Sequence, residues 1–549
     1  MESVAELLAA RAGDGGVGLR FEEDSWTWAE VVAESVRRAA LLEALRRPGP
    51  FHVGVLLENV PEFLFLLGGA ALSGATLVGI NPTRRGEELA RDVRHTDCQL
   101  VITGREQAGL LEGLDLGVDP DRVLTVGSGP YGALIGEASG AGIPDPVPGP
   151  EALYLLLFTS GSTGAPKAVR VSQGRMAGAG LAMARGSGFG SGDVLYCAMP
   201  MFHGNALNSC VIPAVASGAT LVLRRRFSAT GFLPDIQRFG ATYFNYVGRA
   251  LAYILAVPPA LGEGENRLKF AFGTEASPAD MKAFRARFGC PVVEGYGSSE
   301  GAFNMSRVPG TPRNALGKAP DSMDIAVVDP ATLVECPRAV FDEGGRLCNA
   351  SEAIGEMVAR DGVGRFEGYW ANEEADAART REGWFWSGDL GYRDAEGFFY
   401  FAGRPADWLR VDGENFAAAP VERVLARFPG VVTAAVYPVP DAATGDQVMV
   451  TLELLEGETF DPDGFVRFLG DQTDLGTKWA PRYVRVGRVP LTGSNKVDKG
   501  PLRAARWTTE DPVWWRLPGE TGYRPMVPAD WDAVRAEFEA QGRLGVLEV

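Results

Sequence analysis

The sequence predicts an α/β protein whose N-terminal part is larger than its C-terminal part. Through the first 130 residues, apolar strand-like runs alternate with helix-like runs, as in FHVGVLLEN, PEFLFLLGGAAL and ATLVGI. Such alternation is typical of βαβ units, in which helices cover a mainly parallel sheet. After about residue 320 the pattern changes to short strands and turns, which indicates a barrel-like region. A new α+β pattern begins at Arg404 and predicts a smaller domain.

The elements follow from local signals. We expect a helix to begin at Pro61, because proline suits the first turn of a helix. The stretch RRGEELARDVRHTD is amphipathic, with Leu89 and Val93 four residues apart. The most apolar window, residues 63–80, is interrupted by glycines. We therefore interpret it as a core helix and a core strand rather than a membrane span. Residues 139–151 form a Pro/Gly-rich linker.

Composition narrows the class of protein. The chain has 549 residues, with 46% hydrophobic and 22% charged, as in ordinary globular proteins. Its 53 basic and 70 acidic residues give a net charge of −17, which argues against nucleic acid as the main partner and against more than peripheral membrane contact. The N-terminus does not read as a signal peptide, and the six cysteines form no CxxC pair. These features favour a cytoplasmic protein with reduced thiols.

The segment FTSGSTGAPKAV, residues 158–169, has the composition of a phosphate-binding loop. It fails the Walker pattern, because its two glycines are three residues apart and a proline precedes the lysine. Hydroxyls, glycine N–H groups and one lysine still suit a polyphosphate, and a surface turn is the weaker alternative. The candidate residues are Thr159, Ser160, Gly161, Ser162, Thr163, Gly164 and Lys167.

A second glycine pattern, GxGxxG, occurs at Gly127, Gly129 and Gly132 after a strand-like run. It is the pattern of a dinucleotide-binding loop. Pro130 lies where the helix of such a loop should begin, so we interpret the segment as a connecting turn.

Five segments in order make the first loop resemble the signature of the adenylate-forming (ANL) superfamily, which includes acyl-CoA synthetases, luciferases and peptide-synthetase adenylation domains. The other segments are EGYGSSEG (294–301), GWFWSGDLGYRD (383–394), FAGRPADWLRVDGENFAAAPVE (401–422) and PLTGSNKVDKGPLR (490–503). The resemblance implies two αβ-layered subdomains and a small β-barrel in residues 1–403. It also implies a mobile C-terminal domain in residues 404–549.

The resemblance implies two half-reactions that use ATP, Mg²⁺ and coenzyme A. A carboxylate attacks the α-phosphate to give an acyl-adenylate and pyrophosphate, and a thiol then displaces AMP. Lys496 matches the lysine that reaches both the carboxylate and the α-phosphate, where negative charge builds up. Glu300 matches the residue that holds Mg²⁺, a hard cation that prefers oxygen ligands.

The same resemblance implies a set of nucleotide-binding residues. Tyr296 matches the ring that stacks on adenine, and Asp389 and Arg404 suit the ribose hydroxyls, with structural salt bridges as the alternative. Ser299 replaces the usual threonine and keeps its hydroxyl. The remaining members are Gly273, Thr274, Glu275, Glu294, Gly295, Gly297 and Ser298.

His203, in MPMFHGNALNS, resembles the histidine that lines the tunnel between the acyl and thiol sites. His52 and His95 have no such motif and are expected to be structural. The hinge and CoA-facing positions implied by the resemblance are Ala406, Arg410, Gly413 and Asn415. Ala406 stands where Asp or Lys is usual. The segment LRVDGEN is most similar to the very-long-chain and fatty-acid-transport-protein branch.

We therefore expect an ATP-dependent acid–CoA ligase for a hydrophobic acid, either a long-chain fatty acid or a bulky sterol or terpenoid acid. Small residues such as Gly248 and Gly273 would leave room for such an acid. An acyl-AMP ligase that loads a carrier protein, and a peripheral protein coupled to lipid uptake, are the alternatives. The acid, ATP and CoA are the expected partners, and a homodimer is left open.

Overall fold

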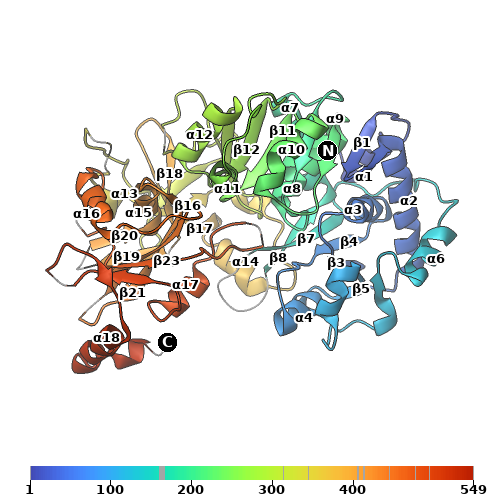
Figure 1. Cartoon of the computed structure of the whole chain (residues 1–549). Coiled ribbons are helices and arrows are strands. Elements are labelled where there is room, and N and C mark those ends of the chain that lie inside the picture. The colour runs from blue at the N-terminus through green and yellow to red at the C-terminus, as the bar shows by residue number, and fades with distance from the viewer. Residues whose placement is uncertain are drawn as a thin grey trace.

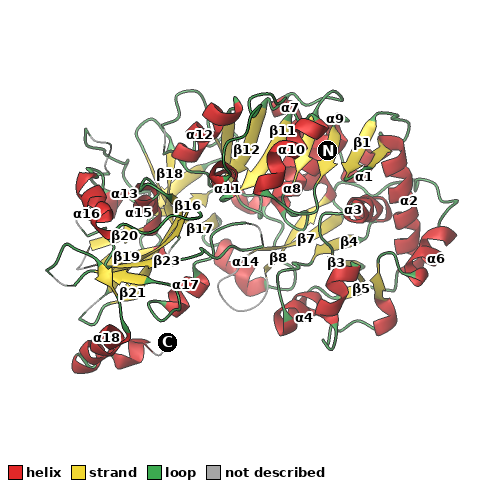
Figure 2. Ribbon diagram, in the orientation of Figure 1, coloured by secondary structure: helices red, strands yellow, loops and turns green. Residues whose placement is uncertain are grey.

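The computed structural model describes residues 2–159, 167–312, 314–343, 345, 347–404, 407–411, 414–443, 445–476, 478–493, 495–517 and 519–547, without the side chains of 414 and 415. Two larger α/β regions and a third, sheet-rich region precede the C-terminal part of the chain, which lies at the opposite side of the molecule from the first helices (Figure 1). Figure 2 shows the helices packed around the sheets. The predicted α/β class is confirmed.

Two mainly parallel sheets form the N-terminal region. The eight-stranded sheet has the order β14 (Asn304–Ser306), β13 (Val292–Gly297), β12 (Phe270–Thr274), β11 (Tyr243–Val247), β9 (Val194–Cys197), β10 (Thr220–Leu223), β1 (Val17–Phe21), β2 (Asp24–Thr27). The six-stranded sheet has the order β6 (Val123–Thr125), β5 (Cys98–Thr103), β3 (His52–Leu56), β4 (Thr76–Gly79), β7 (Leu153–Thr159), β8 (Lys167–Ser172). One large apolar core joins the two sheets.

The helices of this region follow the sequence signals. Helix α3 (Pro61–Ser73) begins with proline, is buried along most of its length and ends at Gly74 in a left-handed conformation. It packs on α2 (Trp28–Leu45), and β4 follows it. The apolar window is therefore a core helix and a core strand, as predicted. Among the described residues, no helix is both long enough and apolar enough to cross a membrane.

The other helices of this region range from 3 to 15 residues in length. They are α1 (Val4–Ala9), α4 (Gly86–His95), α5 (Arg105–Ala108), α6 (Gly129–Glu137), α7 (Gln173–Ser187), α8 (Gly204–Ala206), α9 (Ile212–Ser217), α10 (Ala229–Phe239), α11 (Ala250–Ala256) and α12 (Pro278–Phe288).

Our interpretation of the GxGxxG segment as a connecting turn was wrong. Helix α6 begins at Gly129 with Ser128 as its N-cap, because Pro130 fits the first helical turn.

An antiparallel sheet follows where the short strands were expected. Its order is β15 (Ile325–Val328), β16 (Gly355–Ala359), β17 (Phe385–Arg393), β18 (Phe399–Gly403). An isolated bridge between Gly317 and Phe399 of β18 extends it. The short helices α13 (Ala350–Ala353) and α14 (Glu373–Arg379) lie between its strands in the sequence.

The C-terminal part is an α+β unit. A hairpin, β19 (Trp408–Val411) and β20 (Glu414–Ala417), precedes a five-stranded sheet of β21 (Val431–Pro440), β22 (Asp446–Leu454), β23 (Tyr483–Val486), β24 (Val513–Trp515) and β25 (Arg524–Pro525). Its helices are α15 (Ala418–Leu425), α16 (Pro462–Asp471), α17 (Gly500–Ala505) and α18 (Pro528–Ala540). Two apolar clusters, built from residues after 408, form its core.

Candidate active site

The phosphate loop connects two antiparallel strands. Thr159 ends β7 and pairs with Lys167, which begins β8. The intervening candidates Ser160, Gly161, Ser162, Thr163 and Gly164 lie outside the described residues. Burial and then the nearby Arg379 lower the pKa of Lys167, while Glu300 opposes this effect. The hairpin thus brings Lys167 near two charged groups from other parts of the chain.

Glu300, the predicted metal ligand, is buried, and its Oε1 accepts a hydrogen bond from the Tyr369 hydroxyl at 2.7 Å. This bond orients the carboxylate. A carboxylate is the oxygen ligand that Mg²⁺ prefers, and Mg²⁺ sites in ATP-using proteins take one or two carboxylates and fill the rest with phosphates and water. No cluster of three or more His, Cys, Asp or Glu ligands occurs in the described part of the chain. Glu300 therefore fits Mg²⁺ bound together with ATP.

Arg379 lies at the site although sequence reasoning missed it. It is at the end of α14, and its Nη1 donates to the Trp386 carbonyl at 3.1 Å. A Cβ atom at Gly388 would lie 2.4 Å from the same Nη1, so the guanidinium lies close against the main chain at this glycine. Tyr369 and Glu300 raise the pKa of Arg379 against the opposing effect of burial. Its only sequence signal is a basic residue between two motifs.

Asp389 joins two of the predicted nucleotide residues. Its Oδ1 accepts from Arg404 Nε at 2.9 Å, and its Oδ2 accepts from the Tyr296 hydroxyl. Asp389 is also the first cause of the raised pKa of Arg404. The structural salt bridge, which the sequence analysis gave as the alternative to ribose binding, is therefore present between Asp389 and Arg404. The Tyr296 ring has Phe303 and Phe401 as neighbours, with ring centroids 6.4 Å away in each case.

The remaining members of the adenine motif lie in β13 and in the loop that follows it. Gly295 and Gly297 lie in the strand, and the buried Ser298 Oγ has no hydrogen-bond partner among the described residues. The Ser299 carbonyl accepts from Arg175. Gly301 has φ +77°, and a Cβ there would lie 2.5 Å from Arg175 Nε. Arg175, a residue that no motif singled out, therefore supports this loop.

A short turn follows β12, which ends with Gly273 and Thr274. Glu275 has φ +73°, and its Oε1 accepts from Lys496 Nζ at 2.6 Å. The carboxylate of Glu294 accepts from the Ala276 N–H at 2.6 Å and from the Tyr246 hydroxyl at 3.0 Å. Burial raises the pKa of Glu294 to about 7. Glu294 thus holds the turn that presents Glu275.

The lysine loop of the small domain is docked on the large domain. Asn495 Nδ2 lies 3.9 Å from the Met199 sulfur. A Cβ at Gly248 would lie 2.1 Å from the Asn495 carbonyl oxygen, and a Cβ at Gly493 would lie 2.8 Å from the Asn81 side chain. The main chain at Asn495 therefore approaches Gly248 closely, and Gly493 lies against the Asn81 side chain. These contacts hold the loop just before Lys496 and place its ammonium at the candidate site.

His203 lies at the same place. It precedes α8, which continues into a π-helical turn, Leu207–Val211, a feature that often marks functional sites. Its ring centroid is 4.4 Å from that of Phe202, and its buried Nε2 has no hydrogen-bond partner in the described structure. Burial, with a smaller contribution from Lys496, lowers the pKa of His203 to about 4. His203 is therefore neutral at physiological pH.

The expectation that small residues leave room for the acid is wrong at two positions. A Cβ at Gly273 would lie 2.4 Å from the Tyr246 carbonyl oxygen and 2.7 Å from its ring. At Gly248 the lysine loop takes the space. Both glycines permit close packing of the chain rather than a wide pocket.

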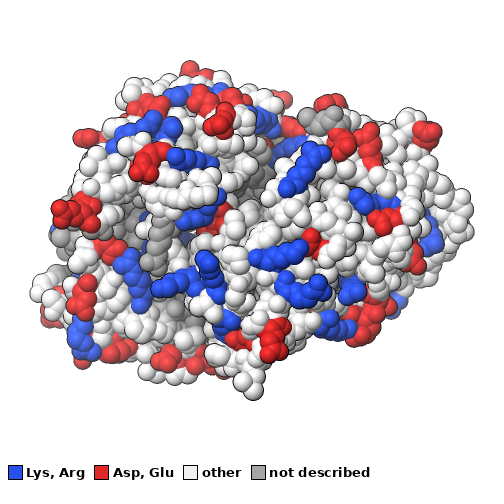
Figure 3. Space-filling view, turned by 90° about the horizontal axis from the view of Figure 1, so that it is seen from above, with Lys and Arg blue, Asp and Glu red and all other residues white. Residues whose placement is uncertain are grey.

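Of the predicted CoA-facing residues, Arg410 is the one whose side chain the structure describes. Arg410 lies in β19, where its N–H donates to Asp446 of the small domain at 2.9 Å. Ala406 and Gly413 lie outside the described residues, as does the side chain of Asn415. Lys and Arg side chains nevertheless gather across the middle of one face of this acidic protein, beside a hollow (Figure 3).

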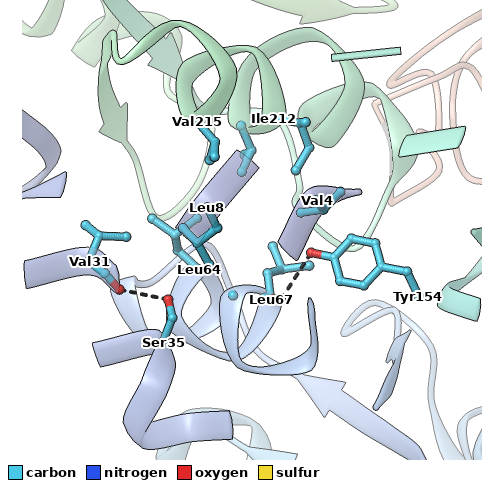
Figure 4. Close-up of a pocket in the computed structure, with 11 residues that line it drawn as sticks. Val4, Leu8, Val31, Ser35, Leu64, Leu67, Tyr154, Ile212 and Val215 are labelled. Atoms are coloured by element: carbon cyan, nitrogen blue, oxygen red, sulfur yellow. Dashed lines mark hydrogen bonds between the residues drawn. The ribbon is translucent and has the colours of Figure 1, made fainter. Parts of the chain in front are cut away.

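An apolar cavity lies away from these residues. It is lined by helices α1, α2, α3 and α9 and by Tyr154, at the far end of β7 from Thr159 (Figure 4). Its few polar groups are used: Tyr154 donates to the Leu67 carbonyl at 3.1 Å, and Ser35 to the Val31 carbonyl at 2.8 Å. The cavity thus offers no chemistry to the site.

Comparisons with known proteins agree with this arrangement. The AMP-binding enzyme family matches residues 9–370. The steroid-22-oyl-CoA synthetase of Rhodococcus jostii is 53% identical over 100% of this chain and 99% of its own length. The medium/long-chain-fatty-acid–CoA ligase FadD17 of Mycobacterium marinum is 43% identical over 93% of this chain and 98% of its own.

Solved structures have the same fold. ATP-bound MatB from Rhodopseudomonas palustris has a TM-score of 0.78 at 25% identity, over 92% of this chain and 98% of its own. The anthranilate CoA ligase AuaEII, in complex with anthranoyl-AMP, has a TM-score of 0.78 at 21% identity, over 92% and 97%. The likeness to AuaEII shows the fold, with its large N-terminal and small C-terminal domains.

Proposed function

Because the chain belongs to the AMP-binding enzyme family, we propose that it is an ATP-dependent acid–CoA ligase. It joins a hydrophobic carboxylic acid to AMP with release of pyrophosphate and then passes the acyl group to the thiol of CoA. The observation that carries the proposal is the position of Lys496. This lysine belongs to the small C-terminal domain, yet it contacts Glu275 of the large domain, beside the strands that bear the nucleotide motifs.

The charges at the site suit the first half-reaction. An acid carboxylate oxygen attacks the α-phosphorus, and the bond from that phosphorus to the pyrophosphate oxygen breaks. In this proposal Lys496 donates to both reacting groups, while Lys167 and Arg379 neutralise the β- and γ-phosphates. Support comes from the closeness of the two cations, since Arg379 lowers the pKa of Lys167. Glu300 would hold Mg²⁺, which supplies charge neutralisation on the phosphates. Asp389 accepts from the ribose hydroxyls.

In the second half-reaction the CoA sulfur attacks the acyl carbon, and the mixed-anhydride bond to AMP breaks. We assign His203 to the wall of the thiol path here, because a buried neutral imidazole offers one hydrogen-bond donor and one acceptor without the cost of burying a charge. It serves as a hydrogen-bonding group beside the thiol path rather than as a cation.

The relatives' names support a hydrophobic substrate. One is named for a steroid-22-oyl thioester and the other for medium- and long-chain fatty acids. We rank a steroid carboxylate first, because that relative matches the whole chain at the higher identity. A carrier protein as acceptor and a peripheral role in lipid uptake are second candidates that the same adenylation chemistry would allow.

The test is a panel of steroid, fatty and aryl acids, incubated with ATP and Mg²⁺ and scored for nucleotide products with and without CoA. We expect AMP and pyrophosphate with a steroid or long-chain acid, and a thioester only when CoA is present. Release of ADP and phosphate would overturn the proposal. Acyl transfer to a phosphopantetheinyl carrier protein but not to CoA would favour the second candidate.

We place the domain boundary after Gly403, where β18 ends, with a mobile small domain from Arg404 onward. Support comes from the two apolar clusters built from residues after 408. Cytoplasmic location and homodimer formation are further predictions, which cell fractionation and light scattering would test.

A further inference from the structure

The ion pair between Lys496 and Glu275 links residues 221 positions apart, with 2.6 Å between Nζ and Oε1. It joins the lysine loop of the small domain to the turn after β12 in the large domain. Both side chains remain about half exposed, at 40% and 45%. A reacting carboxylate and phosphate can therefore still reach the ammonium.

The turn is built to present this carboxylate. Glu275 has φ +73°, a conformation that glycine adopts freely and that costs free energy for a residue with a Cβ. Its neighbour Ala276 is fixed by the hydrogen bond from its N–H to Glu294, which in turn accepts from Tyr246. An observed backbone outlier of this kind is a reason to ask what the side chain does.

The charges around Glu275 keep it ionised. Partial removal from water in the docked interface acts to raise the pKa of Glu275, but the charges of Lys496, Arg404 and Arg249 outweigh it and lower that pKa overall. The carboxylate thus stays negative at neutral pH, where the lysine is positive. The pair attracts the two domains toward each other in the arrangement that the structure shows.

The ammonium of a lysine has three N–H donors. One of them goes to Glu275, which leaves two for the two groups that adenylation brings together, the acid carboxylate and the α-phosphate. We propose that Glu275 is a positioning residue that orients Lys496 for adenylation and favours the docked position of the small domain. This inference rests on the proposed ligase function and deepens it.

An opposite role is conceivable on the same geometry. Glu275 could occupy the place of the substrate carboxylate and so hold Lys496 away from its substrates. The two roles predict opposite signs. Removal of an orienting partner slows adenylation, whereas removal of a competitor leaves it unchanged or speeds it.

The test uses Glu275→Gly and Glu275→Gln in the full chain. Glycine relieves the left-handed backbone, so Glu275→Gly should fold at least as stably as the natural protein. Glutamine keeps the size and removes the charge. Glu382→Gly is the matched control, because Glu382 is an exposed glutamate with φ +53°. Each protein is assayed for pyrophosphate release in a single turnover and for thioester formation from supplied acyl-adenylate and CoA.

We expect adenylation to fall about fivefold in both Glu275 variants, the size that a partly exposed ion pair supports. Thioester formation from the supplied adenylate should be unchanged or faster. In a Lys496→Ala background, Glu275→Gly should cause no further loss, because its effect passes through the lysine. Adenylation at or above the natural rate, or an equal fall of both half-reactions, would overturn the inference. Failure of the natural protein to release pyrophosphate would instead refute the ligase proposal.

Discussion

At the scale of single residues, His203 shows how burial sets a protonation state. Its pKa falls from 6.5 to about 4, mainly because the ring is buried. Between these pH values the His203 ring is mostly protonated in the unfolded chain and mostly neutral in the folded protein. The contribution of His203 to stability is therefore present above pH 6.5 and is lost as the pH falls toward 4.

We predict that His203→Gln reduces the acid sensitivity of the protein. Between pH 7 and pH 5 the natural protein should lose about 2 kcal/mol more unfolding free energy than the variant, measured by urea unfolding. The chain has three histidines, so NMR of labelled imidazoles can assign the His203 signal by its disappearance in the variant. A titration midpoint near 6.5 for that signal would contradict the prediction.

Candidate site residues could be proposed from the sequence, because their motifs have fixed spacing. Lys496, Glu300, Tyr296 and Asp389 are examples. Their supporting partners could not. Tyr369 orients Glu300 from 69 positions away, and Arg175 reaches Ser299 from 124. A single tyrosine or arginine carries no sequence pattern that identifies a partner so distant in the chain.

At the scale of elements, periodicity and helix signals predicted α3, β4 and α4 well, because each is decided by its own residues. The sequence contains no comparable signal for where two elements will approach each other closely. Gly248 and Gly273 look like space in a pocket wall, yet each is covered by another part of the chain. The composition of a segment does not say what will pack against it.

We predict that Gly248→Ala hinders docking of the lysine loop. A Cβ there would lie 2.1 Å from the Asn495 carbonyl oxygen, and backbone cannot move aside as a side-chain end can. Overpacking of this kind costs about 1–3 kcal/mol, or roughly 5- to 150-fold in the docked population. Adenylation should fall by that factor in single-turnover assays, while thioester formation from supplied acyl-adenylate is retained.

Gly289→Ala is the control for this experiment. Gly289 also has a left-handed backbone, with φ +67°, but no atom lies within 4 Å of its would-be Cβ. Both variants therefore carry similar backbone strain, and the difference between them reports the clash alone. Equal adenylation rates in the two variants would show that the loop does not need this close approach.

At the scale of the whole molecule, the structure holds one arrangement of two domains. Lys496 contacts Glu275 of the large domain, whereas the main-chain N–H of Arg410, a residue predicted to face CoA, donates to Asp446 of its own domain. Asp407 lies 3.3 Å from Arg503 and 3.7 Å from Lys499, so the start of the small domain is tied to the lysine loop. If both half-reactions use one nucleotide site, the small domain must turn as a unit between them. Sequence patterns predicted the two domains but not this relative position, because no local signal encodes it.

We predict that a disulfide across the docked interface separates the half-reactions. A Cβ at Gly493 would lie 3.0 Å from Thr83 Oγ1, which suits a disulfide between cysteines at these positions. The Asn81 amide, at 2.8 Å, is the end of a side chain and can move aside. In the oxidised Thr83→Cys/Gly493→Cys variant, adenylation should persist, while thioester formation from supplied acyl-adenylate should stop because the domain cannot turn.

Reduction of the disulfide should restore thioester formation, which separates locking from damage by the substitutions. Each single variant, treated with the same oxidant, controls for the natural thiols, of which Cys348 is exposed. Mass spectrometry of the peptides would confirm the cross-link. If the fully cross-linked protein forms thioester at the rate of its reduced form, the docked arrangement serves both half-reactions and rotation of the small domain is not required.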